Sequence, residues 1–149
     1  MNIIGKMSLG AIVIAAAACS TSDRKEKVPT IKEVLKEVTG QNGRACVRTS
    51  DIQGYGTLKY DIVSIDARRK YYLATLLPGC NSVSTSFQAL FVGSFSEVCG
   101  GAINKMVTRE DNCVIHQMYE FESREEAFAV YESAVAKRDE IRDSIKNAK

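Results

Sequence analysis

The stretch that decides the fold runs from residue 46 to residue 113 and begins CVRTSDIQGYGTLKYDIVSIDARRKYYLATLLPGC (residues 46–80). It contains four of the five cysteines, and runs of β-branched and aromatic residues alternate in it with turns rich in Gly, Pro, Asn and Asp. Such runs are typical of strands. We expect strands at residues 45–49, 57–65, 70–77, 87–92, 102–108 and 113–121, with a turn-rich segment at 50–56 and a loop at 93–101. A change of phase in the second strand predicts a bulge near Ile62. Strands at this spacing predict a small antiparallel six-stranded sheet that curls into a small barrel or sandwich.

A helix is expected on each side of this stretch, so the fold class is mainly β and α+β overall. At residues 30–40, Thr30 and Glu33 have the spacing of a capping box, and apolar residues follow at helical intervals. Ser123 and Glu126 repeat the signature at the start of a long helix at residues 123–147. Its apolar stripe thins after Val135. We expect this helix to cover one face or open end of the sheet, and a partner-binding helix is the alternative.

The first residues of the chain indicate secretion. Lys6 precedes a twelve-residue run of apolar or small residues at 7–18, interrupted only by Ser8. This is typical of a secretory signal and too short to span a bilayer. Because Cys19 directly follows Ala16-Ala17-Ala18, the segment resembles a bacterial lipoprotein signal, in which this thiol takes a diacylglyceryl group. It departs from that pattern at Ala16, where Leu is usual. Cleavage that leaves Cys19 unlipidated is the alternative. By resemblance to sorting rules, Ser20 favours the outer membrane.

The expected organisation is a lipoprotein signal peptide at 1–18, a lipidated tether at 19–29, the short amphipathic helix at 30–40, a disulfide-stapled β domain at 44–122 and the C-terminal helix at 123–147. Removing the signal leaves 131 of the 149 residues, enough for one domain. The formal net charge falls from +2 to +1 with Lys6, which does not predict nucleic-acid binding. The predicted location is the cell envelope, anchored to the outer membrane and facing the periplasm.

The four cysteines other than Cys19 predict two disulfides, because their number is even and the expected compartment is oxidising. Three pairings are possible, and the sequence alone does not choose between them. The pairing we prefer joins Cys80 to Cys99, around one strand, and Cys46 to Cys113, which ties the first strand to the start of the last. No metal site is expected, because spacings of 34, 19 and 14 residues lack the short knuckles of zinc sites.

The same residues resemble a family of small bacterial envelope lipoproteins that carry a cysteine-containing domain of unknown function. The shared pattern covers about residues 44–116. In chain order it consists of Cys46, Ile52, Tyr55, Leu58, a Tyr-containing strand that ends in Leu77-Pro78-x-Cys80, a Phe-containing strand before Cys99, and Cys113. The resemblance implies a fold and a compartment, and no activity, substrate or cofactor. Members of that family often end soon after the last cysteine, so the helix from Ser123 is expected to be an addition.

No catalytic cluster is apparent, and we predict no catalytic residue and no cofactor. His116, the only histidine, lies three positions after Cys113, a spacing that places the two on opposite faces of a strand. One basic cluster, Arg68, Arg69 and Lys70, precedes two tyrosines. It is either a contact with an anionic surface, such as lipid headgroups or a glycan, or a charged hairpin turn.

Three functions remain open at this point. The favoured one is a non-catalytic envelope module that binds or supports another envelope protein or a glycan and reaches the membrane through its lipid anchor. The second is a small periplasmic enzyme whose site forms only in three dimensions. The third is an inhibitor-like lipoprotein that presents a loop such as residues 81–86 to a partner protein.

Overall fold

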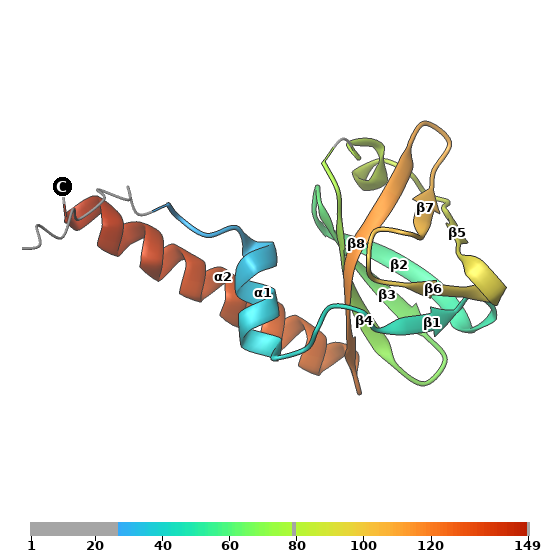
Figure 1. Ribbon diagram of the computed structural model, residues 1–149, viewed down its shortest axis with the longest axis horizontal. Coiled ribbons are helices and arrows are strands. Elements are labelled where there is room, and N and C mark those ends of the chain that lie inside the picture. Colours follow the sequence, from blue (N-terminus) through green and yellow to red (C-terminus); the bar gives the residue numbers. More distant parts are fainter. Residues whose placement is uncertain (1–26, 79, 149) are drawn as a thin grey trace, which may run out of the picture.

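The computed structural model describes residues 27–78 and 80–148 (Figure 1). The elements in chain order are α1 (Ile31–Thr39), β1 (Cys46–Arg48), η1 (Thr49–Asp51), β2 (Ile52–Lys59), β3 (Ile62–Ala67), β4 (Tyr71–Leu76), η2 (Ser82–Ser84), β5 (Leu90–Val92), η3 (Ser94–Ser96), β6 (Glu97–Cys99), β7 (Lys105–Val107), β8 (Asn112–Phe121) and α2 (Arg124–Asn147), where η marks a short 3₁₀ helix.

Six of the strands form one sheet in the order β2-β3-β4-β8-β7-β5, and each neighbouring pair is antiparallel. The sheet curls into a half-barrel with β2 at one edge and β5 at the other. The remaining two strands, β1 and β6, pair with each other in a separate antiparallel ribbon. The predicted class is confirmed: the fold is mainly β and α+β overall, with a curled six-stranded antiparallel sheet, two disulfides, a short first helix and a long last one.

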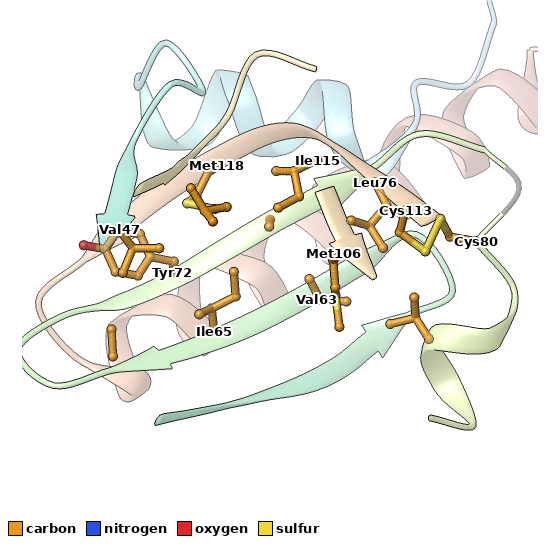
Figure 2. Packing of buried hydrophobic residues seen from close by; sticks show 14 residues of the cluster. Val47, Val63, Ile65, Tyr72, Leu76, Cys80, Met106, Cys113, Ile115 and Met118 are labelled. Carbon is orange, nitrogen blue, oxygen red and sulfur yellow. A yellow bond between two sulfur atoms is a disulfide. The ribbon is translucent and has the colours of Figure 1, made fainter. Parts of the chain in front are cut away.

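The sheet is covered on both faces, so all six residues of β4 are buried. On one face, which we call the ribbon face, the sheet packs against the β1–β6 ribbon and the segment at 80–89. Figure 2 shows this core: Val47 from the ribbon meets Tyr72 and Met118 at one end, and Cys80 and Cys113 close the other. The opposite face, the helix face, packs against α1 and α2.

The first helix forms where the sequence predicts it and docks through its apolar stripe. The Thr30 hydroxyl accepts a hydrogen bond from the Glu33 backbone N–H, and the Glu33 carboxylate accepts one from the Thr30 backbone N–H, so the predicted capping box is present. Val34 and Leu35 are fully buried in the helix-face core. Because an isolated nine-residue helix is marginal in water, this docking is what stabilises α1.

The second helix lies across the same face. Ala127 and Ala134 are its buried residues, and their small side chains let the helix backbone approach the sheet. After Val135 no residue in the described part of α2 is buried, and Figure 1 shows the helix extending beyond the sheet alongside α1. None of the helices within residues 27–78 and 80–148 has the length and apolar character needed to cross a membrane.

The prediction of a single strand at 57–65 is wrong, because these residues belong to the two strands of a hairpin. Tyr60 and Asp61 make the turn, and Ile62 begins β3. The change of phase that predicted a bulge near Ile62 therefore marks a reversal of direction. The preceding segment at 50–56, expected to be turns, contributes most of β2, and the loop expected at 93–101 contains β6.

The preferred disulfide pairing is also wrong. The bonds join Cys46 to Cys99 and Cys80 to Cys113, and not Cys46 to Cys113 or Cys80 to Cys99. We expected the first strand beside the last, but only the residues that precede β1 pair with β8, at a single parallel bridge between Arg44 and Met118. The first strand pairs with β6 in a register that places Cys46 opposite Cys99, with their Cα atoms 4.0 Å apart. Cys80 follows β4 and reaches Cys113 near the start of β8, the strand paired with β4.

Candidate functional site

A groove runs between the two edge strands of the half-barrel. Its volume is about 1410 Å³, above the range of about 300–1000 Å³ typical of small-molecule sites. One wall is β2, and the other is the segment at 83–91, which ends in β5. Since β2 and β5 stand at the two ends of the strand order, the groove occupies the place where further strands would close the barrel.

Two hydroxyl groups on β2 connect the walls of the groove. The Tyr55 hydroxyl donates a 2.6 Å hydrogen bond to the carbonyl oxygen of Ser86, and the Thr57 hydroxyl donates one of 3.3 Å to that of Val83. The Tyr55 ring also meets the Phe91 ring edge to face, with centroids 6.2 Å apart. Burial raises the pKa of the Tyr55 phenol, so the group remains a neutral donor at ordinary pH.

The far wall is fastened to the turn between β7 and β8. The backbone N–H of Ser82 donates to the Asp111 carboxylate over 3.0 Å, and the hydroxyls of Ser82 and Thr108 lie 2.7 Å apart in a buried hydrogen bond. Hydrogen bonds from the side chain and then the backbone of Ser82 lower the pKa of Asp111. The buried Cys80–Cys113 disulfide holds the same two segments. This wall is therefore fixed by covalent and polar bonds.

The lining of the groove is suited to binding an uncharged or weakly charged ligand. It is drawn from residues 49, 52–57, 83–91 and 107–109, and Arg109 is its single charged residue. The lining contains no carboxylate, imidazole or thiol, the groups most often used for acid–base and nucleophilic catalysis. The groups that it offers to a ligand are aromatic rings, hydroxyls and the amides of two glutamines.

A second, smaller hollow lies at the opposite face of β2. Its volume is about 400 Å³, and it is lined by residues 54–58 of β2, by Ser64, Asp66 and Tyr71, and by Arg124 and Phe128 of α2. The Arg124 guanidinium lies 5.2 Å from the centre of the Phe128 ring, within reach of a cation–π interaction. Residues 54–57 line both the groove and this hollow, so one edge segment has open space on both of its faces.

The sequence profile of DUF6491, described as a family of unknown function, matches residues 3–138. The chain belongs to this family. No curated protein and no solved structure matches the chain. The DUF6491 match extends well beyond residues 44–116 and includes α1, both edge strands of the groove and α2 as far as residue 138. The expectation that the long helix is an addition to the family's domain is therefore wrong for its first fifteen residues, 124–138.

The predicted basic cluster lies at the turn between β3 and β4 and does not act as one patch. Arg68 and Arg69 are exposed. Lys70 instead forms ion pairs with Glu120, at 3.3 Å, and with Glu122. The hydrogen bond to Glu122 raises the pKa of Lys70. Two cations, and not three, remain available at this turn of the DUF6491 domain.

Those of the remaining predicted positions that the structure describes lie apart from the groove. Cys19 falls outside the described residues. Cys46, Cys99 and Glu97 are close together, but both sulfurs belong to a disulfide and cannot serve as metal ligands. His116 is exposed at a bulge of β8, where it is the extra residue opposite Thr75 and Leu76 of β4, and it lines neither hollow.

Sequence reasoning missed the groove of the DUF6491 domain because it read residues 50–56 as turns. One signal was available in QGYGT, residues 53–57, where two glycines alternate with larger residues. In a strand, this alternation places both glycines on one face. A glycine inside a strand often marks a place where a ligand or another backbone approaches closely.

Proposed function

We propose that this DUF6491 protein is a non-catalytic binding module of the bacterial cell envelope, lipid-anchored through Cys19 to the outer membrane and facing the periplasm. Two observations support the compartment. The segment at 1–19 has the charge, apolar run and cysteine of a lipoprotein signal. The two disulfides suit an oxidising compartment such as the periplasm.

The observation that carries the binding function is the groove between the edge strands. It is large, one of its walls is fixed by a disulfide and hydrogen bonds, and its lining offers aromatic and hydroxyl groups with a single charge. A site of this kind suits recognition of an extended ligand better than chemistry on a small one. The groove and the helices lie on opposite sides of the sheet, because α1, which begins at Ile31, packs with α2 on the helix face (Figure 1). A module anchored through residue 19 would therefore carry its binding site away from the side where the tether enters.

The anchor is tested by the mass of the intact protein from a membrane fraction, beside a Cys19→Ala variant. We expect a lipid-sized mass on the wild type that the variant lacks. Alkylation without reduction should add no mass, and alkylation after reduction should mark residues 46, 80, 99 and 113. An unlipidated wild type in the soluble fraction would contradict the anchored form.

The binding function is tested by photocrosslinking in intact cells. A crosslinking amino acid at Gln88, an exposed residue of the groove wall, is compared with the same group at Glu132, an exposed residue of α2. We expect discrete adducts from position 88 that position 132 does not form. Equal adducts from both positions, or none from either, would contradict a binding role for the groove.

A second candidate, the inhibitor-like lipoprotein, is favoured by two fully exposed phenylalanines. Phe87 follows the loop at 81–86, and Phe95 lies in η3 with a positive φ of 54°. The next residue, Ser96, also has a positive φ, so the turn holds two left-handed residues at a cost of about 1–2 kcal/mol each. A crosslinker at position 95, which does not line the groove, separates the candidates. Adducts from position 95 without adducts from position 88 would favour docking of Phe95 into a partner.

A further inference from the structure

We infer that the ligand of the groove is an extended peptide that binds as an additional strand along β2, with a basic side chain beside Asp66. This inference rests on the proposed binding function and names its ligand class. It follows from the edge of β2, from the space on both faces of that edge, and from the charge at one of them.

The outer edge of β2 is unpaired. The strand hydrogen-bonds to β3 on one side, and no backbone hydrogen bond among the described residues reaches residues 53–59 from the other. Its register has bulges at Gln53 and Leu58, and residues 54–57 between them pair regularly with β3. An edge of this kind presents a row of unpaired N–H and C=O groups and is a template for another strand.

The space around this edge matches what an added strand needs. Successive side chains of a strand point to opposite faces, so a strand laid along residues 54–57 sends alternate side chains into the groove and into the smaller hollow. In strand addition, main-chain hydrogen bonds supply affinity and pockets for alternate side chains supply specificity. A ligand that used only one face would leave the other hollow unexplained.

The two glycines leave the face of β2 beside this edge bare. A Cβ built at Gly54 meets no atom within 4 Å, and one at Gly56 would lie 3.1 Å from the Ser64 hydroxyl oxygen. Neither glycine has a positive φ, so backbone conformation does not require glycine at either position. At Gly54 neither the backbone nor internal packing requires glycine. The absence of a side chain at Gly54 is therefore explained by a ligand that approaches this face from outside.

The chemistry of the two hollows specifies the peptide. On the groove side, the rings of Tyr55 and Phe91 favour apolar or aromatic side chains. On the other side, Asp66 stands opposite Gly54 in the register, is exposed, and takes part in no ion pair between described residues. Arg124 in the same hollow lies over the Phe128 ring. The peptide should therefore alternate apolar residues with polar ones, and carry Lys or Arg beside Asp66.

The test selects peptides from a displayed library of random octapeptides on the full-length, membrane-extracted protein. The blocking variant is Gly54→Val, which fills open space with a side chain that favours strands. The matched control is Asn112→Val, an exposed strand position that lines neither hollow. On the wild type and the control we expect sequences that alternate apolar with polar residues and carry a Lys or Arg. On Gly54→Val we expect at least a tenfold loss of affinity, with its thermal unfolding unchanged.

Two further measurements define the binding mode. Asp66→Asn should weaken a selected peptide about tenfold, and should leave unchanged the same peptide with Thr in place of its basic residue. Hydrogen exchange should show new protection of backbone amides within residues 53–59 when the peptide binds. Equal affinity for Gly54→Val and wild type, or binding without that protection, would overturn the inference.

The outcomes also separate this inference from the function on which it rests. If crosslinking from position 88 succeeds while no peptide is enriched, the ligand is not a peptide strand, and the binding role stands. If wild-type protein is dimeric and Gly54→Val is monomeric, a second copy occupies the edge and the inference is wrong. If position 88 forms no adducts and no peptide is enriched, both proposals fail.

Discussion

The two faces of the sheet are covered in different ways. The helix face is covered by two regular helices, and its core contains no cysteine. The ribbon face is covered by three-residue strands and 3₁₀ turns, and both disulfides fasten these segments. A helix satisfies its own backbone groups and brings a continuous apolar stripe, whereas short segments bring few contacts each. Covalent bonds therefore stand where regular packing is lacking, and the groove lies on the face built this way.

The largest effect is expected from removing the buried disulfide. Replacing Cys80 and Cys113 together by Ala should lower the free energy of unfolding by more than the chain-entropy contribution alone, which is about 4 kcal/mol for a separation of 33 residues. It should also loosen the wall of the groove that this bond fastens. Chemical denaturation of the double variant measures the change.

The exposed disulfide is the natural control for that experiment. The Cys46–Cys99 bond spans 53 residues, and the chain-entropy contribution is again about 4 kcal/mol. Because the Cys80–Cys113 pair is buried and packed, removing it should cost more than this common value. Limited reduction should alkylate Cys46, which is exposed, before Cys113, which is not. The opposite order would contradict the assignment of the two bonds to the surface and the core.

On the helix face, Leu73→Ala should lower the free energy of unfolding by about 2–5 kcal/mol, because Leu73 is fully buried and its removal leaves a cavity. Peptide binding along β2 should be unchanged. The control on the other side of the molecule is Phe87→Ala, which should change stability by less than about 0.5 kcal/mol because the side chain is fully exposed. Denaturation curves of both variants give the comparison, and a loss of stability in Phe87→Ala would show that this ring is packed.

Alkaline pH should destabilise both faces, through one tyrosine on each. Burial raises the pKa of Tyr72, on the ribbon face, to about 12, with Glu120 adding to the shift, and burial raises that of Tyr119, on the helix face, to about 12. The unfolded value is about 10. The folded state therefore binds these protons more tightly, and the corresponding stability is present below about pH 10 and lost as the pH rises to about 12. Phenolate absorbance followed with unfolding should show the two events together, and Tyr119→Phe should reduce the alkaline loss.

The smallest effect on stability is expected from weakening the hydrogen bonds that hold the groove wall in place. Asp111→Asn should destabilise the protein modestly at neutral pH, because it weakens the acceptor for Ser82. The pKa of Asp111 is lowered in the folded state, so its contribution is present above the unfolded value and lost as the pH falls through the folded one. The stability difference between variant and wild type should therefore shrink toward acid pH. If the stability difference did not change with pH, the effect of Asp111→Asn would not arise from the charge of the carboxylate, and the prediction would be wrong.

Some properties of this chain follow from neighbouring residues alone. The capping box at Thr30 and the cap at Ser123 act over three residues, and both helices begin where these patterns predict. Alternation along a strand is equally local, so most strand positions and the fold class could be predicted. The expectation of two disulfides needed only the number of cysteines and the secretory character of the first residues.

Other properties depend on which strands become neighbours, and only the tertiary structure decided them. Cys46 pairs with Cys99 because β1 leaves the sheet and joins β6, a choice between segments about fifty residues apart for which no local pattern exists. The turn at Tyr60 was hidden because a reversal of direction and a bulge change the phase of a strand alike. The groove was hidden for a related reason. Whether QGYGT becomes an inner strand or a bare edge depends on how far the curled sheet closes, and the free energy of that closure is spread over all six strands of the sheet.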